Sequence, residues 1–159
     1  MLRQTGWATI GDRIEREVTT IYRGAARTMY ETIVDRDDTS VDSGSPLASG
    51  HYSASTRIGL DSPNTSVAPI DSSYNYPSPE VHKYSVYNLP RPTIRATPSS
   101  VVTAWLRPFR LGQTIYISNA SAYAVTIERG RRGKNGSWQK PRGVYLSSLN
   151  KLFHSQGWY

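Results

Sequence analysis

The chain has 159 residues and no cysteine, which excludes a disulfide framework, a thiolate zinc site and a cysteine nucleophile. Apolar residues make up 37% of the chain, below the roughly 45–50% of an average globular protein, so we expect one modest core in a single domain, residues 1–159. The net charge is +7, but residues 99–159 hold nine basic residues and one acid, and a polyanion would be drawn to this third. Since no stretch approaches the roughly 18 apolar residues of a membrane span or forms a signal peptide, we expect no membrane partner and synthesis in a cytoplasm.

Apolar residues recur in steps of three and four between Trp7 and Ile33, which predicts one stripe along a helix that ends near Val34. The positions of the stripe are 7, 10, 14, 18, 21, 25, 29 and 33. The charged residues expected to face away from it are Asp12, Glu15, Arg16, Arg23 and Arg27.

Three later segments have the composition of β-strands. Alternation over residues 51–60 predicts the first strand, and β-branched and aromatic residues predict two more over 100–108 and 113–118. A turn at Leu111 and Gly112 would join the last two as a hairpin. One long helix followed by strands predicts an α+β fold, with the N-terminal helix packed on a small antiparallel β-sheet.

Residues 61–98 contain seven of the ten prolines and little periodicity. Because such a segment is too long for an ordinary connection, it is either disordered or an arm that becomes ordered against another surface. Its tyrosines favour the arm, since their rings gain by burial, and make it a candidate subunit interface. They are Tyr74, Tyr76, Tyr84 and Tyr87.

The C-terminal third predicts two short helices. Asn119 or Ser121 could cap a helical turn whose inward face holds Tyr123 and Ile127, with Gly130 at its end. A short C-terminal helix is expected from Pro141 onward, with apolar residues at 144, 145, 149, 152 and 153.

A basic loop is expected between these two helices. Lysine and arginine can neutralise phosphates whatever the base sequence, so the loop could face DNA, but it could equally face an acidic protein or serve solubility alone. Its residues are Arg129, Arg131, Arg132, Lys134, Lys140 and Arg142.

Glu128 is the only acid of residues 99–159 and lies at the entrance to this loop. We expect it at the surface, in one of two roles. Its carboxylate either pairs with an arginine of its own chain, at position 129, 131 or 132, or receives an arginine from a neighbouring subunit. An exposed local pair contributes only about 0–1 kcal/mol.

No residue set points to catalysis. His51, His82 and His154 fall in different elements without metal-ligand spacing, and neither HExxH nor GxSxG occurs. The "GRRGKN" stretch has too few residues between its glycines for a phosphate loop, and the aspartates after residue 34 lack the glycine and glutamate of a calcium loop. We expect no enzyme, no metal and no cofactor.

Three short motifs, in this order, resemble the neck and tail-completion proteins of long-tailed bacteriophages, also called minor tail components. "SPLASG" (45–50) resembles the family's S-P-x-D-T-G turn, "YISN" (116–119) its S-N strand, and "AYAVTIERG" (122–130) its P-Y-A and E-x-G segment before a basic loop. The chain departs from the family at Ala48, Ser49, His51 and Ala122. The resemblance covers nearly the whole chain, with 61–98 as an insertion.

The resemblance implies a structural virion protein without catalytic activity. Such proteins form homo-oligomeric rings, commonly hexamers, at the head-tail junction, and a dodecamer is the alternative. The implied partners are the head connector, head-completion and tail proteins, and the genomic DNA in the lumen. The subunit would be made in the host cytoplasm and end in the virion neck or tail. There are two alternatives to a neck protein. One is a tail terminator that caps the tail tube, and the other is a free sequence-independent nucleic-acid-binding protein.

Overall fold

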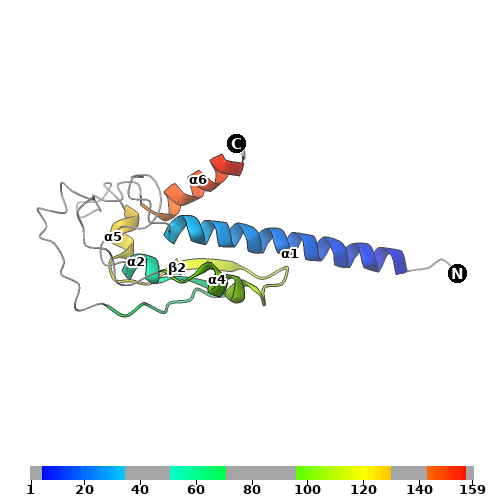
Figure 1. The fold of residues 1–159 in the computed structure, drawn as a ribbon, viewed down its shortest axis with the longest axis horizontal. Coiled ribbons are helices and arrows are strands. Elements are labelled where there is room, and N and C mark those ends of the chain that lie inside the picture. The colour runs from blue at the N-terminus through cyan, green and yellow to red at the C-terminus, as the bar shows by residue number, and fades with distance from the viewer. Residues whose placement is uncertain (1–4, 35–50, 71–95, 130–142, 157–159) are drawn as a thin grey trace, which may run out of the picture.

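A computed structural model describes residues 5–34, 51–70, 96–129 and 143–156, and its fold is α+β, which confirms the predicted class. In chain order its elements are α1 (Thr5–Val34), α2 (His51–Ala54), β1 (Thr56–Leu60), α4 (Ser99–Leu106), β2 (Ile115–Asn119), α5 (Ala124–Arg129) and α6 (Tyr145–Gln156). Helix α1 lies along the small sheet and α4, and α6 packs on its C-terminal part (Figure 1).

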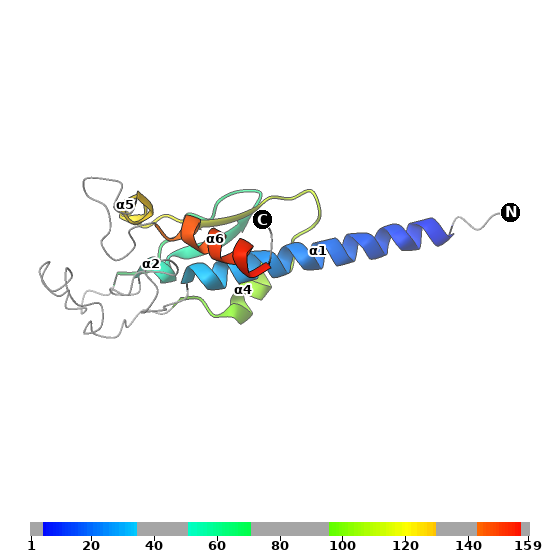
Figure 2. The ribbon, with the colours of Figure 1, turned by 90° about the horizontal axis from the view of Figure 1, so that it is seen from above.

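Helix α1 reaches far beyond the rest of the described body, as Figure 1 and Figure 2 both show. Its 30 residues make it about 45 Å long, at about 1.5 Å per residue. Every residue from 6 to 17 is exposed, whereas Tyr30 and Ile33 near the other end are almost completely buried. The predicted helix and its end at Val34 are confirmed, but only its C-terminal part packs on the body.

The sheet has two antiparallel strands, β1 and β2, which pair from Thr56 opposite Asn119 to Leu60 opposite Ile115. Asp61 closes one end of the pair, since its N–H donates to Thr114 O at 2.8 Å and its Oδ1 accepts from Thr114 N at 3.0 Å. Strand β2 therefore confirms the segment predicted over 113–118.

The strand predicted over 51–60 is correct only in its second half. Residues 51–54 form the single helical turn α2, closed by a 2.9 Å hydrogen bond from Ser55 N to His51 O. All four residues of the turn are buried. Because both sides of this segment are covered, its alternating pattern did not mark a sheet face.

Two predictions are wrong here: the strand over 100–108 and the hairpin turn at Leu111 and Gly112. Residues 99–106 form helix α4 (Ser99–Leu106), and β2 pairs with β1 instead. Val102 and Leu106, four residues apart, are buried against α1, and Trp105 meets Tyr30 edge-on with ring centroids 6.5 Å apart. Tertiary packing on α1 outweighs the β-propensity of the valines. Apolar residues at 101, 102, 105 and 106 have the spacing of a helix, but the high content of β-branched and aromatic residues favoured a strand.

Two apolar clusters form the core, and α1 contributes to both. Ile33 packs with Tyr52, Ala124, Ile127 and Val144, while Tyr30 packs with Ile58, Val102 and Leu106. One turn of α1 thus holds the α5 and α6 side of the molecule and the α4 and sheet side together.

The first ten residues of the segment predicted as an arm, 61–70, lie against the body without forming a helix or strand. Ser118 Oγ donates to Asn64 O at 2.8 Å, and Ala68 N donates to Ser55 Oγ at 3.1 Å. Residues 71–95, with the four candidate tyrosines Tyr74, Tyr76, Tyr84 and Tyr87, lie outside the described residues.

Candidate functional site

Glu128, expected at the surface, is half-buried, and its carboxylate is held by donors from two other elements. Oε1 accepts the hydroxyl of Tyr52 at 2.5 Å, and Oε2 accepts Val144 N at 3.2 Å and Tyr145 N at 3.0 Å. These two amides open α6, where negative charge is stabilised by the helix dipole and by charge-assisted hydrogen bonds. Glu128 therefore ties α2, α5 and α6 together.

Gly143 allows the chain to approach Glu128 closely. Its φ of +78° lies in the left-handed region, and a Cβ at this position would come within 2.6 Å of Glu128 O. A glycine is therefore needed for the amides of Val144 and Tyr145 to reach the carboxylate.

His51 forms a second set of contacts beside the first. Its Nε2 lies 2.8 Å from Ala68 O and its Nδ1 lies 2.6 Å from the Tyr123 hydroxyl. Because a carbonyl can only accept, Nε2 carries a proton, and in the neutral ring Nδ1 accepts from Tyr123. His51 is thus a buried packing histidine that joins α2 to the 61–70 segment and the start of α5.

Asn119 completes the network at the end of β2. Its Nδ2 donates to Tyr52 O at 2.7 Å, and its Oδ1 accepts from both Ser121 N at 3.0 Å and Ser121 Oγ at 2.7 Å. Asn119 was predicted as one of two possible helix caps, but its side chain instead holds the turn before α5, in which Ser121 O accepts Ala124 N at 2.9 Å.

The chemistry of the network is that of a structural clamp. Burial, reinforced by the charge of Glu128, raises the pKa of Tyr52 above the ordinary range of tyrosine, and burial followed by the same charge raises that of Tyr145. Both phenols therefore stay protonated at neutral pH, and the Glu128 carboxylate is occupied by three donors.

The structure brings together residues of two of the three motifs. Asn119 comes from "YISN", Tyr123 and Glu128 come from "AYAVTIERG", and both meet the residues that directly follow "SPLASG", His51 and Tyr52. Tyr52 and Gly143 were not predicted from the sequence to belong to a site, and Glu128 stood out only through its isolation among positive charges. The "SPLASG" segment itself lies outside the described residues.

Of the predicted basic loop, the structure describes only Arg129, which is exposed at the end of α5. Arg131, Arg132, Lys134, Lys140 and Arg142 lie outside the described residues. Whether this loop faces DNA or protein stays a prediction, as does a subunit contact of Glu128.

A second candidate surface is the apolar stripe of α1, which the sequence predicted as one stripe along the helix. At its C-terminal end, Met29 and Ile33 join a core cluster. Toward the N-terminus the same stripe is uncovered, with Trp7 81% exposed, Ile14 55% and Ile21 64%. The face that packs on α4, with Ala26 and Tyr30, lies about a third of a turn away.

The fold and the site define a small α+β protein with a polar clamp and a projecting amphipathic helix. In the described parts of the chain no group of three or more His, Cys, Asp or Glu could hold a metal ion, and no described helix is long and apolar enough to cross a membrane. No protein-family model, no curated protein and no solved structure matches the chain.

Proposed function

We propose that this protein is a structural virion subunit that assembles into a ring at the head-tail junction of a bacteriophage and connects the head connector to the tail around the DNA channel. The single observation that carries the proposal is the uncovered apolar stripe of α1. The order of the three motifs and the charge of the C-terminal third support it.

The stripe is the kind of surface that an assembling subunit carries. Side chains as large as Trp7, Ile10, Ile14 and Ile21 each gain roughly 1.5–3 kcal/mol when removed from water, and contiguous exposed apolar surface marks interaction sites. The side chains project from one helix face over about 20 Å, a length that a second helix can cover.

A second copy of the chain is the occupant that the surrounding charges favour. Over residues 6–23, α1 carries three acids, Asp12, Glu15 and Glu17, and three arginines, Arg13, Arg16 and Arg23. Equal numbers of both signs suit a partner with the same mixture. A purely acidic or purely basic partner would leave half of them unmatched.

The test is the mass of the purified protein and of two variants by light scattering. We expect the wild type to form an oligomer, a hexamer or a dodecamer, and Ile10→Asp with Ile14→Asp to form monomers. Val67→Asp adds a charge at an exposed apolar residue outside α1 and should leave the oligomer intact. A wild-type chain that stays monomeric and does not co-assemble with neck or tail proteins would refute the proposal. Contacts in the particle would distinguish a tail terminator from a neck protein.

A free nucleic-acid-binding protein is the second candidate, favoured by the nine basic residues and one acid of residues 99–159. It predicts duplex DNA binding that falls steeply with salt, and a strong loss of affinity when Arg131, Arg132 and Lys134 are changed to Ala. Absent binding at low salt would remove this candidate.

A further inference from the structure

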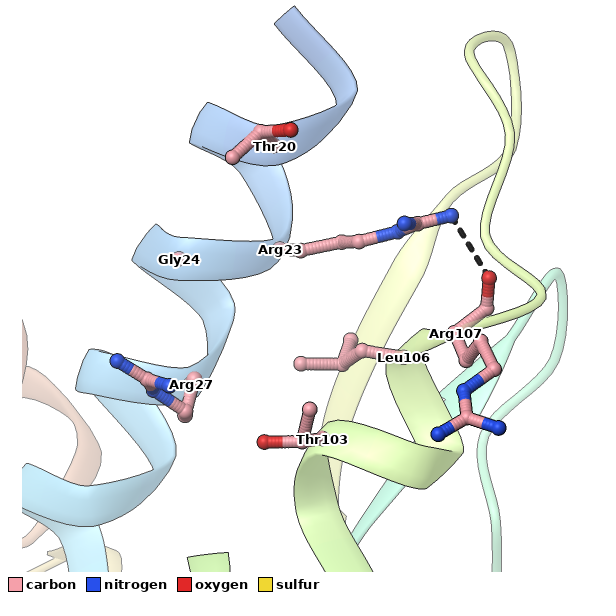
Figure 3. A pocket seen from close by; sticks show the side chains of 7 residues that line it. All are labelled: Thr20, Arg23, Gly24, Arg27, Thr103, Leu106 and Arg107. Carbon is pink, nitrogen blue, oxygen red and sulfur yellow. Dashed lines mark hydrogen bonds between the residues drawn. The ribbon is translucent and has the colours of Figure 1, made fainter. Parts of the chain in front are cut away.

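A groove between α1 and α4 is lined by basic residues and has no role in the clamp or the stripe. It has a volume of about 370 Å³ and is lined by Thr20, Arg23, Gly24, Arg27, Thr103, Leu106 and Arg107. Figure 3 shows Arg23 crossing from α1 toward the end of α4, with Leu106 and Thr103 pointing back toward α1. Three of the seven lining residues are arginines, and none is a carboxylate.

Arg23 is fixed across one end of the groove. Its Nη2 donates to Arg107 O at 2.7 Å and to Phe109 O at 2.8 Å, so it satisfies carbonyls just beyond α4. Its Nε is buried and has no hydrogen-bond partner among the described residues. A buried charged donor without an acceptor is costly, and negative charge in the groove would offset that cost through space.

The other two arginines keep spare donors. Arg107 is exposed, and Arg27 makes only a long contact with Glu31, 3.7 Å between Nε and Oε1, with each of these two side chains about half exposed. The threonine hydroxyls already donate to their own helices, Thr20 to Arg16 O and Thr103 to Ser99 O. Guanidinium groups therefore dominate, and they can only donate, so the groove fits an anion rich in acceptors.

The neighbouring hollow on the same side of α1 differs in charge. Asp12 and Glu15 line it together with Arg16, Arg23 and Arg110, so carboxylates offset two of its three positive charges. Of these two hollows, only the groove that contains Arg23, Arg27 and Arg107 has no carboxylate in its lining.

We propose that the groove between α1 and α4 binds a phosphate group, either of a nucleic-acid backbone or of free phosphate. Arginine matches phosphate because its planar fork donates to two oxygens at once. Arg27 and Arg107 are exposed, so their side chains can turn toward the remaining oxygens of the phosphate. The proposal does not depend on ring assembly or on the basic loop, because Gly24, Arg27 and Arg107 lie outside both the α1 stripe and that loop.

Gly24 offers a way to fill the groove without removing charge. A Cβ at Gly24 meets no atom within 4 Å, and the same holds for Gly11, which is exposed on the same helix outside the groove. Gly24→Leu should occupy the groove and raise helix propensity, and Gly11→Leu is the matched control for propensity. Arg27→Gln with Arg107→Gln removes charge instead, and Arg13→Gln is the control for charge.

Binding of inorganic phosphate is followed by ³¹P NMR and binding of a duplex oligonucleotide by fluorescence anisotropy, both at low salt. We expect Gly24→Leu and the Arg27, Arg107 double variant to weaken binding at least tenfold, while both controls bind as the wild type does. If these two variants lose binding of both probes, the groove is a nucleic-acid backbone site. If they lose binding of inorganic phosphate alone, it is a free-phosphate site. Gly24→Leu that binds both probes as Gly11→Leu does, or a wild type that binds neither, overturns the proposal.

Discussion

The carboxylate of Glu128 accepts hydrogen bonds from three donors on two other elements, and this explains an acid at the entrance to a positively charged segment. A carboxylate that accepts a phenol and two helix-opening amides contributes far more than an exposed ion pair, because its partners are otherwise left without acceptors. The arginines that follow it in the sequence are not needed to explain its presence.

Replacement of Glu128 should therefore destabilise the fold. We expect Glu128→Ala to lower the free energy of unfolding by roughly 2–4 kcal/mol, because the hydroxyl of Tyr52 and the amides of Val144 and Tyr145 lose their acceptor. Glu128→Gln, which keeps one acceptor oxygen, should lose less. Urea unfolding followed by circular dichroism measures both.

Glu31→Ala is the matched control, since it removes a partly exposed glutamate from a weak helical pair and should change stability by less than about 0.5 kcal/mol. If Glu128→Ala were as stable as Glu31→Ala, the clamp would not hold α6.

Sequence reasoning could identify Glu128 as unusual but could not find its partners. Charge isolation is visible in one dimension, whereas the meeting of Tyr52, Glu128 and Val144 depends on how α1 brings α2, α5 and α6 together. Gly143 could have been found as a glycine just before a helix, yet its positive φ and its closeness to Glu128 follow only from the fold.

At the scale of elements, α1 is one helix with two kinds of surroundings. Periodicity predicted it well, because steps of three and four leave few alternatives over 30 residues. The same periodicity could not separate a face that packs inside the chain from one that continues into solvent. For α4 and α2, short length and packing on both sides made the local pattern ambiguous, and tertiary contacts decided the structure.

The two ends of the α1 stripe should respond in opposite ways to truncation. Ile33→Ala is expected to cost roughly 2–4 kcal/mol of unfolding free energy, because Ile33 is completely buried. Trp7→Ala with Ile10→Ala should change the stability of the monomer by less than about 0.5 kcal/mol, since both side chains are exposed.

Urea unfolding at several protein concentrations tests this contrast. If the stripe assembles, the wild type should become more stable as concentration rises, and the Trp7, Ile10 variant should not. A concentration-independent loss of stability in that variant would mean that the N-terminal stripe is covered within its own chain.

For the molecule as a whole, buried tyrosines make the stability of the fold depend on pH in the alkaline range. Burial raises the pKa of Tyr30, Tyr52 and Tyr145, so these phenols keep their protons in the folded state after they ionise in the unfolded chain. The unfolded state then binds fewer protons, and stability is full below about pH 10 and lost as pH rises above it.

Each buried tyrosine should lower the free energy of unfolding by up to about 1.4 kcal/mol per pH unit above about pH 10. Tyr52→Phe, which has no proton to lose, should make this decline less steep by about the contribution of one tyrosine. Urea unfolding at pH 9, 10 and 11 measures the slopes. Equal slopes for the wild type and Tyr52→Phe would show that Tyr52 ionises freely in the folded protein.

The projection of α1 also makes the helix a lever arm. About 35 Å of helix separates Trp7 from Tyr30, and Tyr30 and Ile33 seat the far end in the two core clusters. A tilt of about 10° at that seat would move Trp7 by about 6 Å. The diameter of any ring built through the stripe would then be set by how two buried side chains pack, far from the contact between subunits.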